Sequence, residues 1–283
     1  YFNKKNYKMA EKWYLESEKL GFLESKYNLG HVYYEIKNFD KAEKYFQEVI
    51  EKVPHLKENA TEKLINVYNS QANVYLTSGD FDKAEKYLKI LVEKYSIKEC
   101  YYNLAVINRQ KGNIEKYKEY ILKGIELGDS QCMFSYALFV YSETGKYTEE
   151  VDRWLKKAAE KDHVDAMYEL GLFASEQNRI EDSKKWYKKA AEKGETTAMN
   201  NLANIYSDEG NKEEAMKLYL ESAEKGNPLA FFNLGNYYKE NNNIEFAKEY
   251  YSKVLDSLKG YPTSKLEQEA VNRLKKLQSG ENN

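Results

Sequence analysis

Apolar residues recur along the chain with a spacing near 3.6, in segments that come in pairs. The spacing predicts amphipathic helices. In the last complete pair it predicts one helix from Pro228 to Glu240 and a second from Ile244 to Leu258. The apolar positions that carry this pattern are Phe231, Leu234, Tyr238, Phe246, Tyr250 and Val254.

A small residue recurs in the first helix of each pair, at intervals of 42, 33, 32, 34, 32 and 32 residues. It stands at Gly30, Ala72, Ala105, Ala137, Gly171, Ala203 and Gly235. A large residue follows about 15 residues later in the second helix, at Tyr45, Tyr87, Tyr120, Trp154, Trp186, Leu218 and Tyr250. Two helices that cross closely need a small residue at the crossing, and we expect the aromatic residue of the partner helix to fill the remaining space.

Several local motifs resemble known repeats. Trp186–Gly194 (WYKKAAEKG) and Trp154–Lys161 (WLKKAAEK) resemble Sel1-like repeats, whereas Asn38–Ala42 and Gly79–Ala84 resemble tetratricopeptide repeats. The resemblance implies an all-α fold, a right-handed α-solenoid of antiparallel helix pairs. We expect about seven full repeats over residues 22–258, a partial N-terminal repeat (a second helix) over 1–21, and a capping helix with a polar tail over 259–283. Such motifs specify an architecture and leave the ligand open.

The ends and one insertion add detail. Tyr1 and Phe2 align with the end of a first helix, so we expect the natural protein to continue upstream. Ser264–Glu267 is a capping-box pattern that opens the final helix, and the polar tail is expected from Gln278. The 42-residue interval places about ten extra residues at Pro54–Lys63, which predicts a first helix about two turns longer than its neighbours.

Composition excludes several classes of protein. Lys and Arg number 44 and Asp and Glu 46, a net charge of −2 that predicts no attraction to nucleic acid. The longest apolar run, Cys132–Tyr141, is about half of a ~20-residue membrane span, so we expect no insertion into a membrane. Abundant Lys, Asn, Ile and Tyr with 3 Pro favour an AT-rich, bacterial genome. The compartment, cytoplasm or cell envelope, stays open.

Catalytic motifs are missing from the sequence, which has no phosphate loop, His-Glu-x-x-His, Cys-x-x-Cys or Gly-x-Ser-x-Gly. The three histidines are scattered. Cys100 and Cys132 fall in the same small-residue column of consecutive repeats, so we expect two free, buried thiols. We therefore predict a protein without enzymatic activity, cofactor or metal site.

The resemblance implies that a partner binds the concave surface, which the first helix of each pair lines. Carried over by position, the principal groove candidates are Tyr27, His31, Tyr34, Asn69, Asn73, Tyr102, Arg109, Phe134, Leu138, Tyr141, Tyr168, Asn200, Asn204, Phe232 and Asn236. The wider surface carries seven acids (Glu24, Glu35, Glu99, Asp165, Glu176, Asp208 and Glu240) against two bases, Arg109 and Lys239. The lysine and arginine clamp that holds a C-terminal carboxylate in some relatives is missing.

Two groups within this set have alternative interpretations. The pairs Asn69/Asn73 and Asn200/Asn204 lie one turn apart, where amides can bond an extended peptide backbone or a neighbouring helix. The run Cys132–Tyr141 is apolar around almost the whole helix, so it is either buried on all sides or presents an adhesive face.

These features predict a protein-interaction scaffold that holds a neutral or basic, extended peptide or partner protein in an acidic, aromatic groove. Two alternatives stay open. The chain could be a regulatory or targeting domain of a larger protein, including an enzyme, whose other part lies upstream. It could also be a structural subunit of a bacterial cell-envelope assembly.

Overall fold

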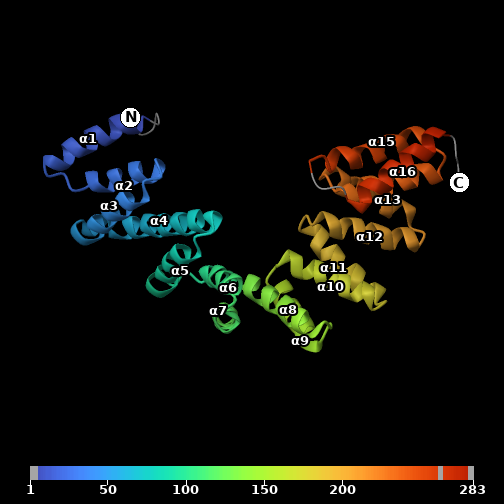
Figure 1. Cartoon of the computed structure of the whole chain (residues 1–283), viewed down its shortest axis with the longest axis horizontal. Coiled ribbons are helices and arrows are strands. Elements are labelled where there is room, and N and C mark those ends of the chain that lie inside the picture. Colours follow the sequence, from blue (N-terminus) through green and yellow to red (C-terminus); the bar gives the residue numbers. More distant parts are fainter. Residues whose placement is uncertain (1–5, 261–263, 280–283) are drawn as a thin grey trace. The chain divides into compact units, whose positions relative to one another are not determined.

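The computed structural model describes residues 6–260 and 264–279, and every regular element within them is a helix (Figure 1). A single 3₁₀ turn, Pro54–Leu56, interrupts the series of α-helices. The α-helices are α1 (Tyr7–Lys19), α2 (Ser25–Glu35), α3 (Phe39–Lys52), α4 (Lys57–Ser78), α5 (Phe81–Tyr95), α6 (Cys100–Gln110), α7 (Ile114–Glu126), α8 (Ser130–Thr144), α9 (Glu149–Ala159), α10 (Val164–Glu176), α11 (Ile180–Glu192), α12 (Thr196–Asp208), α13 (Lys212–Glu224), α14 (Pro228–Glu240), α15 (Ile244–Ser257) and α16 (Lys265–Ser279).

The chain forms two compact units, Tyr1–Cys132 and Met133–Asn283, and the boundary between them falls inside α8. In unit 1, α2 packs on α3, α4 on α5, and α6 on α7. In unit 2, α10 packs on α11, α12 on α13, and α14 on α15. Each such pair also contacts the next pair of its unit, so the predicted all-α array of antiparallel helix pairs is confirmed.

The second helix of a pair begins at a repeated cap. The side chains of Asn38, Asp80, Asn113, Asn211 and Asn243 each accept a hydrogen bond from the backbone N–H three residues later. Such a cap satisfies a donor that the helix cannot use, and each contributes about 1 kcal/mol. The short turns between the helices of a pair are therefore defined by local chemistry.

Close helix crossings occur at the glycines of the small-residue column. A Cβ atom on Gly30 would lie 2.7 Å from the ring of Phe46, one on Gly171 2.5 Å from the ring of Tyr187, and one on Gly235 2.6 Å from that of Tyr251. These contacts leave no room for a side chain at the crossing.

The ring that faces the glycine lies one position beyond the column we expected. A step of one residue turns a side chain by about 100° around the helix, so the expected residues point away from the crossing. Some of them stack instead against the first helix of the same pair. Tyr45 stacks on Tyr33 at 5.5 Å, and Tyr87 stacks on Tyr75 at 5.8 Å. The expectation that the Tyr45 column fills the crossing was therefore wrong.

The predicted extension of one first helix is confirmed. Helix α4 has 22 residues, whereas α2 and α6 have 11 each, and it follows directly on the 3₁₀ turn. At the other end of the chain, Tyr1 and Phe2 lie outside the described residues.

The C-terminal helix begins with the predicted capping box. The backbone N–H of Glu267 donates to Ser264 Oγ at 3.1 Å, and that of Ser264 donates to Glu267 Oε2 at 3.3 Å. Ala270 and Leu277 are buried in the cluster that also contains Tyr251 of α15. Helix α16 runs to Ser279, so the first two residues of the expected tail are helical, and residues 280–283 lie outside the described part.

Both cysteines are free and buried, as predicted. No helix in the described part of the chain is long and apolar enough to cross a lipid bilayer.

Candidate partner-binding face

The candidate residues lie on the first helices of the pairs, a surface we call the helix-A face. In unit 1 it is carried by α2, α4 and α6, and in unit 2 by α8 (from Met133), α10, α12 and α14. Of the predicted residues, two are buried, Asn200 and Phe232, and two are exposed, Asn73 and Arg109. The half-buried ones are Tyr27, His31, Tyr34, Asn69, Tyr102, Phe134, Leu138, Tyr141, Tyr168, Asn204 and Asn236.

The candidates on α2 form an aromatic cluster. The His31 ring meets the edge of Tyr27 at 4.7 Å and lies 5.5 Å from Phe46 of α3. Burial, followed by the nearby charge of Lys63, lowers the pKa of His31, which favours a neutral imidazole at pH 7. Tyr34 bridges to α4 through a 3.0 Å hydrogen bond between its hydroxyl and that of Ser70.

On α4 and α6 the candidates are less engaged with one another. Asn69 Oδ1 lies 4.0 Å from Sγ of Cys100, a weak contact that joins α4 to α6. The Arg109 guanidinium lies 5.5 Å from the ring centre of Tyr117 on α7. Asn73 and Arg109 therefore keep polar groups at the surface of unit 1, with Arg109 tethered to its own pair.

The aromatic residues of α8 stack on the next pair of unit 2. Phe134 stacks on His163 with ring centres 4.6 Å apart, and Tyr141 meets Phe173 edge-on at 5.0 Å. Both remain half-buried, as does Leu138 between them. Helix α8 is thus neither wholly buried nor wholly exposed, and it presents a partly covered apolar strip.

The asparagines of unit 2 are joined to neighbouring helices. Asn233 Nδ2 donates to Asn200 Oδ1 at 2.9 Å and to Asn204 Oδ1 at 3.0 Å. The hydroxyl of Tyr219 donates to the same Asn204 oxygen at 2.6 Å. The hydroxyl of Tyr251 donates to Asn236 Oδ1 at 2.7 Å. These bonds tie α12 to α14 and each first helix to its partner.

Burial and contacts with neighbouring helices assign a structural part to three candidates. Asn200 is only 2% exposed, and its oxygen is already paired. Phe232 is 9% exposed and packs 5.6 Å from the ring of Tyr251. The side-chain oxygen of Asn204 accepts two hydrogen bonds, so a peptide could reach only its amide nitrogen.

A carboxylate that the sequence reasoning missed lies on α10. Burial, followed by the charges of Glu176 and Asp165 on the same helix, raises the pKa of Glu169. Tyr168, beside it, lies 6.0 Å from the ring centre of Tyr187. Three acids on one helix make this part of the helix-A face electronegative. Glu169 occupies the column of Asn201 and Asn233, which could have drawn attention to it.

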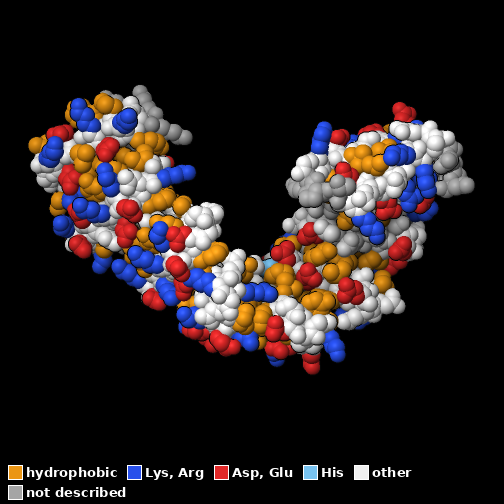
Figure 2. Space-filling model, in the orientation of Figure 1, with side chains coloured by type: hydrophobic (Ala, Val, Ile, Leu, Met, Phe, Trp, Pro, Cys, Tyr) orange, Lys and Arg blue, Asp and Glu red, His pale blue; other side chains and the backbone are white. Residues whose placement is uncertain are grey.

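Charged side chains of both signs are interspersed with apolar patches on the visible surface of each unit (Figure 2). Among the described residues, no group of three His, Cys, Asp or Glu side chains is placed to hold a metal ion.

Comparison with family models assigns most of the pairs. Three tetratricopeptide-repeat models match residues 22–95, residues 196–225, and residues 98–127, 164–192 and 229–257. Together they cover about two thirds of the chain. No curated protein matches the sequence.

Two solved structures illustrate the shared fold. A Sel1 repeat protein from Oxalobacter formigenes is 20% identical, with a TM-score of 0.62, and the match covers 81% of this chain and 98% of that one. PilF of Pseudomonas aeruginosa is 19% identical, with a TM-score of 0.56, over 74% of this chain and 97% of that one. At these identities the likeness concerns the fold alone.

Proposed function

The chain belongs to the tetratricopeptide-repeat family, and on this premise we propose that it is a scaffold that binds a partner protein on its helix-A face. Repeats of this family generally serve protein–protein interaction. The finer proposal is that the partner is neutral or basic and that it binds, in extended form, to the helix-A face of unit 2.

The observation that carries the charge preference is the unbalanced set of acids on α10. Asp165, Glu169 and Glu176 lie on one helix, and the raised pKa of Glu169 reports that burial and its two neighbours already disfavour its charged form. A basic side chain from a partner would relieve this repulsion. An acidic one would add to it, at a cost that grows as water is displaced.

Half-buried aromatic residues supply the apolar part of the proposed interface. Phe134, Leu138 and Tyr141 on α8 and Tyr168 on α10 keep part of their surface open to solvent. Aromatic side chains that are already ordered by neighbours lose little entropy when they are covered, which suits them to anchor a partner.

The sequence allowed asparagine amides to bind the backbone of an extended peptide, and the structure leaves fewer asparagines free to do so. Asn200, Asn204 and Asn236 are occupied in joining helices, so the proposal for unit 2 assigns them no contact with a peptide backbone. The same role for Asn69 and Asn73 stays a separate prediction for unit 1. Asn73 is exposed, and no hydrogen bond of its side chain is found among the described residues.

Selection from a library of displayed random peptides tests the charge preference. We expect the native chain to enrich peptides that contain Lys or Arg beside aromatic residues. The triple variant Asp165→Asn, Glu169→Gln, Glu176→Gln removes three charges almost without changing side-chain shape, and it should lose that enrichment.

The matched control neutralises three exposed acids of unit 2 away from the helix-A face, Glu149→Gln, Glu160→Gln and Glu192→Gln. It should select the same peptides as the native chain. Enrichment of acidic peptides, or equal selection by both variants, would contradict the proposal.

The alternatives of an enzyme-linked regulatory domain and of a cell-envelope subunit stay predictions that the neighbouring gene sequence tests.

A further inference from the structure

Two turns of unit 1, the one between α2 and α3 and the one between α4 and α5, lead into the same seven residues. We call each turn, with the helix start that follows it, a junction. Phe39–Tyr45 at the start of α3 and Phe81–Tyr87 at the start of α5 both read FDKAEKY. The residue before each segment caps the helix, and the residue before that cap has a left-handed backbone. Asp40 is therefore equivalent to Asp82, and Glu43 to Glu85.

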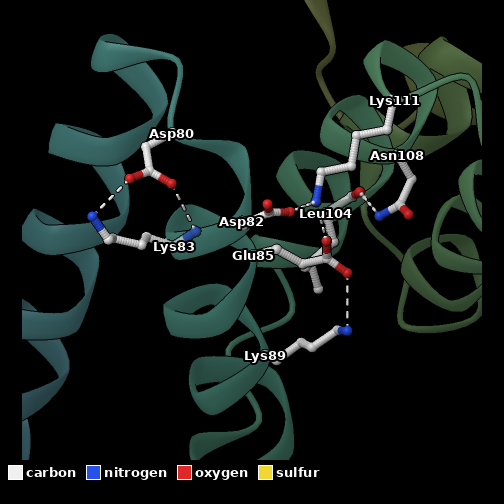
Figure 3. A network of polar contacts seen from close by, with 8 residues as sticks. All are labelled: Asp80, Asp82, Lys83, Glu85, Lys89, Leu104, Asn108 and Lys111. Carbon is white, nitrogen blue, oxygen red and sulfur yellow. Dashed lines mark hydrogen bonds and ion pairs between the residues drawn. The ribbon is translucent and has the colours of Figure 1, made fainter.

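At the second junction the protein supplies its own cations to these acids (Figure 3). Nζ of Lys111, at the end of α6, lies 2.6 Å from Asp82 Oδ1 and 2.7 Å from Glu85 Oε2. Nζ of Lys89 lies 2.9 Å from the other oxygen of Glu85. Glu85 loses hydration by burial, but the lysine hydrogen bonds outweigh this and lower its pKa to about 2. The second junction is electrically balanced.

At the first junction both lysines are replaced. The left-handed Gly79 and Gly112 that follow α4 and α6 align the two helix ends, so Lys111 corresponds to Ser78. Lys89 corresponds to Gln47, whose amide donates to Glu43 Oε1 at 3.1 Å. Two carboxylates that are matched by two ammonium groups in one junction thus have only neutral donors in the other.

A pocket of about 420 Å³ lies at the first junction, beside Asp40. Its walls are the turn Ile36–Asp40 and the side chains of Gln71, Val74 and Tyr75 on α4. Ile36 is 44% exposed and Val74 is 49% exposed, which gives the pocket an apolar rim. No Lys or Arg nitrogen of the described residues lies within ion-pair distance of the Asp40 carboxylate. Lys37 lines the pocket, but it is exposed.

The pocket wall is also short of hydrogen-bond donors. Gln71 is 3% exposed, and its Nε2 donates to Asp40 Oδ1 at 3.4 Å and to the Tyr87 hydroxyl at 3.1 Å. A carboxylate can only accept, so the amide must turn its NH₂ group toward Asp40. This leaves the buried Oε1 of Gln71 without a donor.

We propose that this pocket binds the side chain of a lysine from a partner protein. The ammonium would take the place that Lys111 holds at the second junction and pair with Asp40. Its alkyl chain would lie against Ile36 and Val74, since lysine stems cover apolar surface while the charge reaches a polar group. The inference rests on the proposed scaffold function for its ligand but concerns a separate site in unit 1.

Titration of the isotope-labelled full chain with the peptide acetyl-Ala-Lys-Ala-amide tests this site by NMR. We expect shifts of the backbone amides of residues 37–40, 74 and 75. The same peptide with an acetylated lysine Nζ should bind at least about tenfold more weakly, as expected when a charged hydrogen bond is lost. Asp40→Asn should weaken binding of the lysine peptide by a similar factor.

Two further variants exchange the residues that distinguish the two junctions, Ser78 at the first and Lys111 at the second. Ser78 is exposed at the end of α4, where a cation suits the helix dipole, so Ser78→Lys should fold, fill the pocket from within and abolish peptide binding. Lys111→Ser should open a second lysine site at Asp82 and Glu85. Unchanged binding in Asp40→Asn and Ser78→Lys, or no second site in Lys111→Ser, would overturn the inference. Because the probe is a free peptide, the result is independent of whether the helix-A face of unit 2 binds a partner.

Discussion

Gly171 offers the sharpest test of how the helix pairs pack. A Cβ atom at this position would lie 2.5 Å from Tyr187 Cδ1, where ordinary contact is 3.4–4 Å. Tyr187 is only 2% exposed, so its ring would have to move by about 1 Å inside a filled core. Gly171→Ala therefore replaces a flexible residue by a good helix former at the cost of a clash.

The two effects can be weighed. Replacing Gly by Ala inside a helix contributes about 1 kcal/mol of stability. Overpacking of a dense core costs about 1–3 kcal/mol. We expect Gly171→Ala to destabilise the α10–α11 pair by roughly 0–2 kcal/mol, the difference between these two effects.

Other repeats of the chain already have alanine at the crossing and can be compared with Gly171. Where the small residue is Ala72 or Ala105, the residue at the facing position is aliphatic, Leu88 or Ile121. Where Ala203 faces a tyrosine, that Tyr219 is 6% exposed, more than Tyr187 at 2%. Alanine at the crossing thus goes with a smaller or a slightly more exposed partner.

A double-mutant cycle with Tyr187→Leu isolates the clash. In the background of that substitution the alanine should gain its helix propensity without penalty, which gives a coupling energy of about 1–3 kcal/mol. Repeat pairs can open locally, so hydrogen exchange of α10 and α11 amides should accompany urea unfolding followed by circular dichroism. If Gly171→Ala stabilised the protein by about 1 kcal/mol in both backgrounds, the close crossing would be refuted.

Three further predictions address other parts of the chain. Ser264→Ala removes the capping box and should cost about 1 kcal/mol, seen as faster hydrogen exchange in α16; unchanged exchange would contradict the role of the cap. The pKa of Glu85 is lowered to about 2, so its contribution to stability is present above its ordinary pKa near 4.5 and is lost as the pH falls from there toward 2. Lys111→Met should reduce the pH dependence of unfolding in that range, and an unaltered profile would count against the ion pair. Burial raises the pKa of the Cys100 thiol to about 11 and raises that of Cys132 as well, so neither thiol should react with a disulfide reagent at pH 8 until urea unfolds the chain. Rapid reaction of the folded protein would show that the thiols are accessible.

The helix pairs could be predicted from the sequence because their signals are local. Column spacing, caps and left-handed glycines act within one pair, and helix α14 begins and ends where the pattern placed it. The residue that fills a crossing was misassigned by one position. Trp186 and Tyr187 are both large and aromatic, and the sequence pattern did not show which of the two side chains points toward the crossing.

Contacts between pairs were harder to foresee. Asn233 was not among the residues that the sequence singled out, yet it bonds Asn200 and Asn204 across 33 and 29 residues. The difference between Ser78 and Lys111 likewise acquires meaning only when the identical acids they face are known. Such pairings depend on the stacking of one repeat on the next, which periodicity within a helix does not encode.

Site-specific photo-crosslinking tests the central claim, that a partner binds the helix-A face, most directly. A photoreactive phenylalanine analogue would replace Leu138 or Tyr168 on that face, and Phe246 on α15, which is 45% exposed, would serve as the control. The account predicts that cell lysate yields a crosslinked protein, neutral or basic in its contacting segment, from positions 138 and 168 and none from 246. Crosslinks from position 246 alone would contradict it.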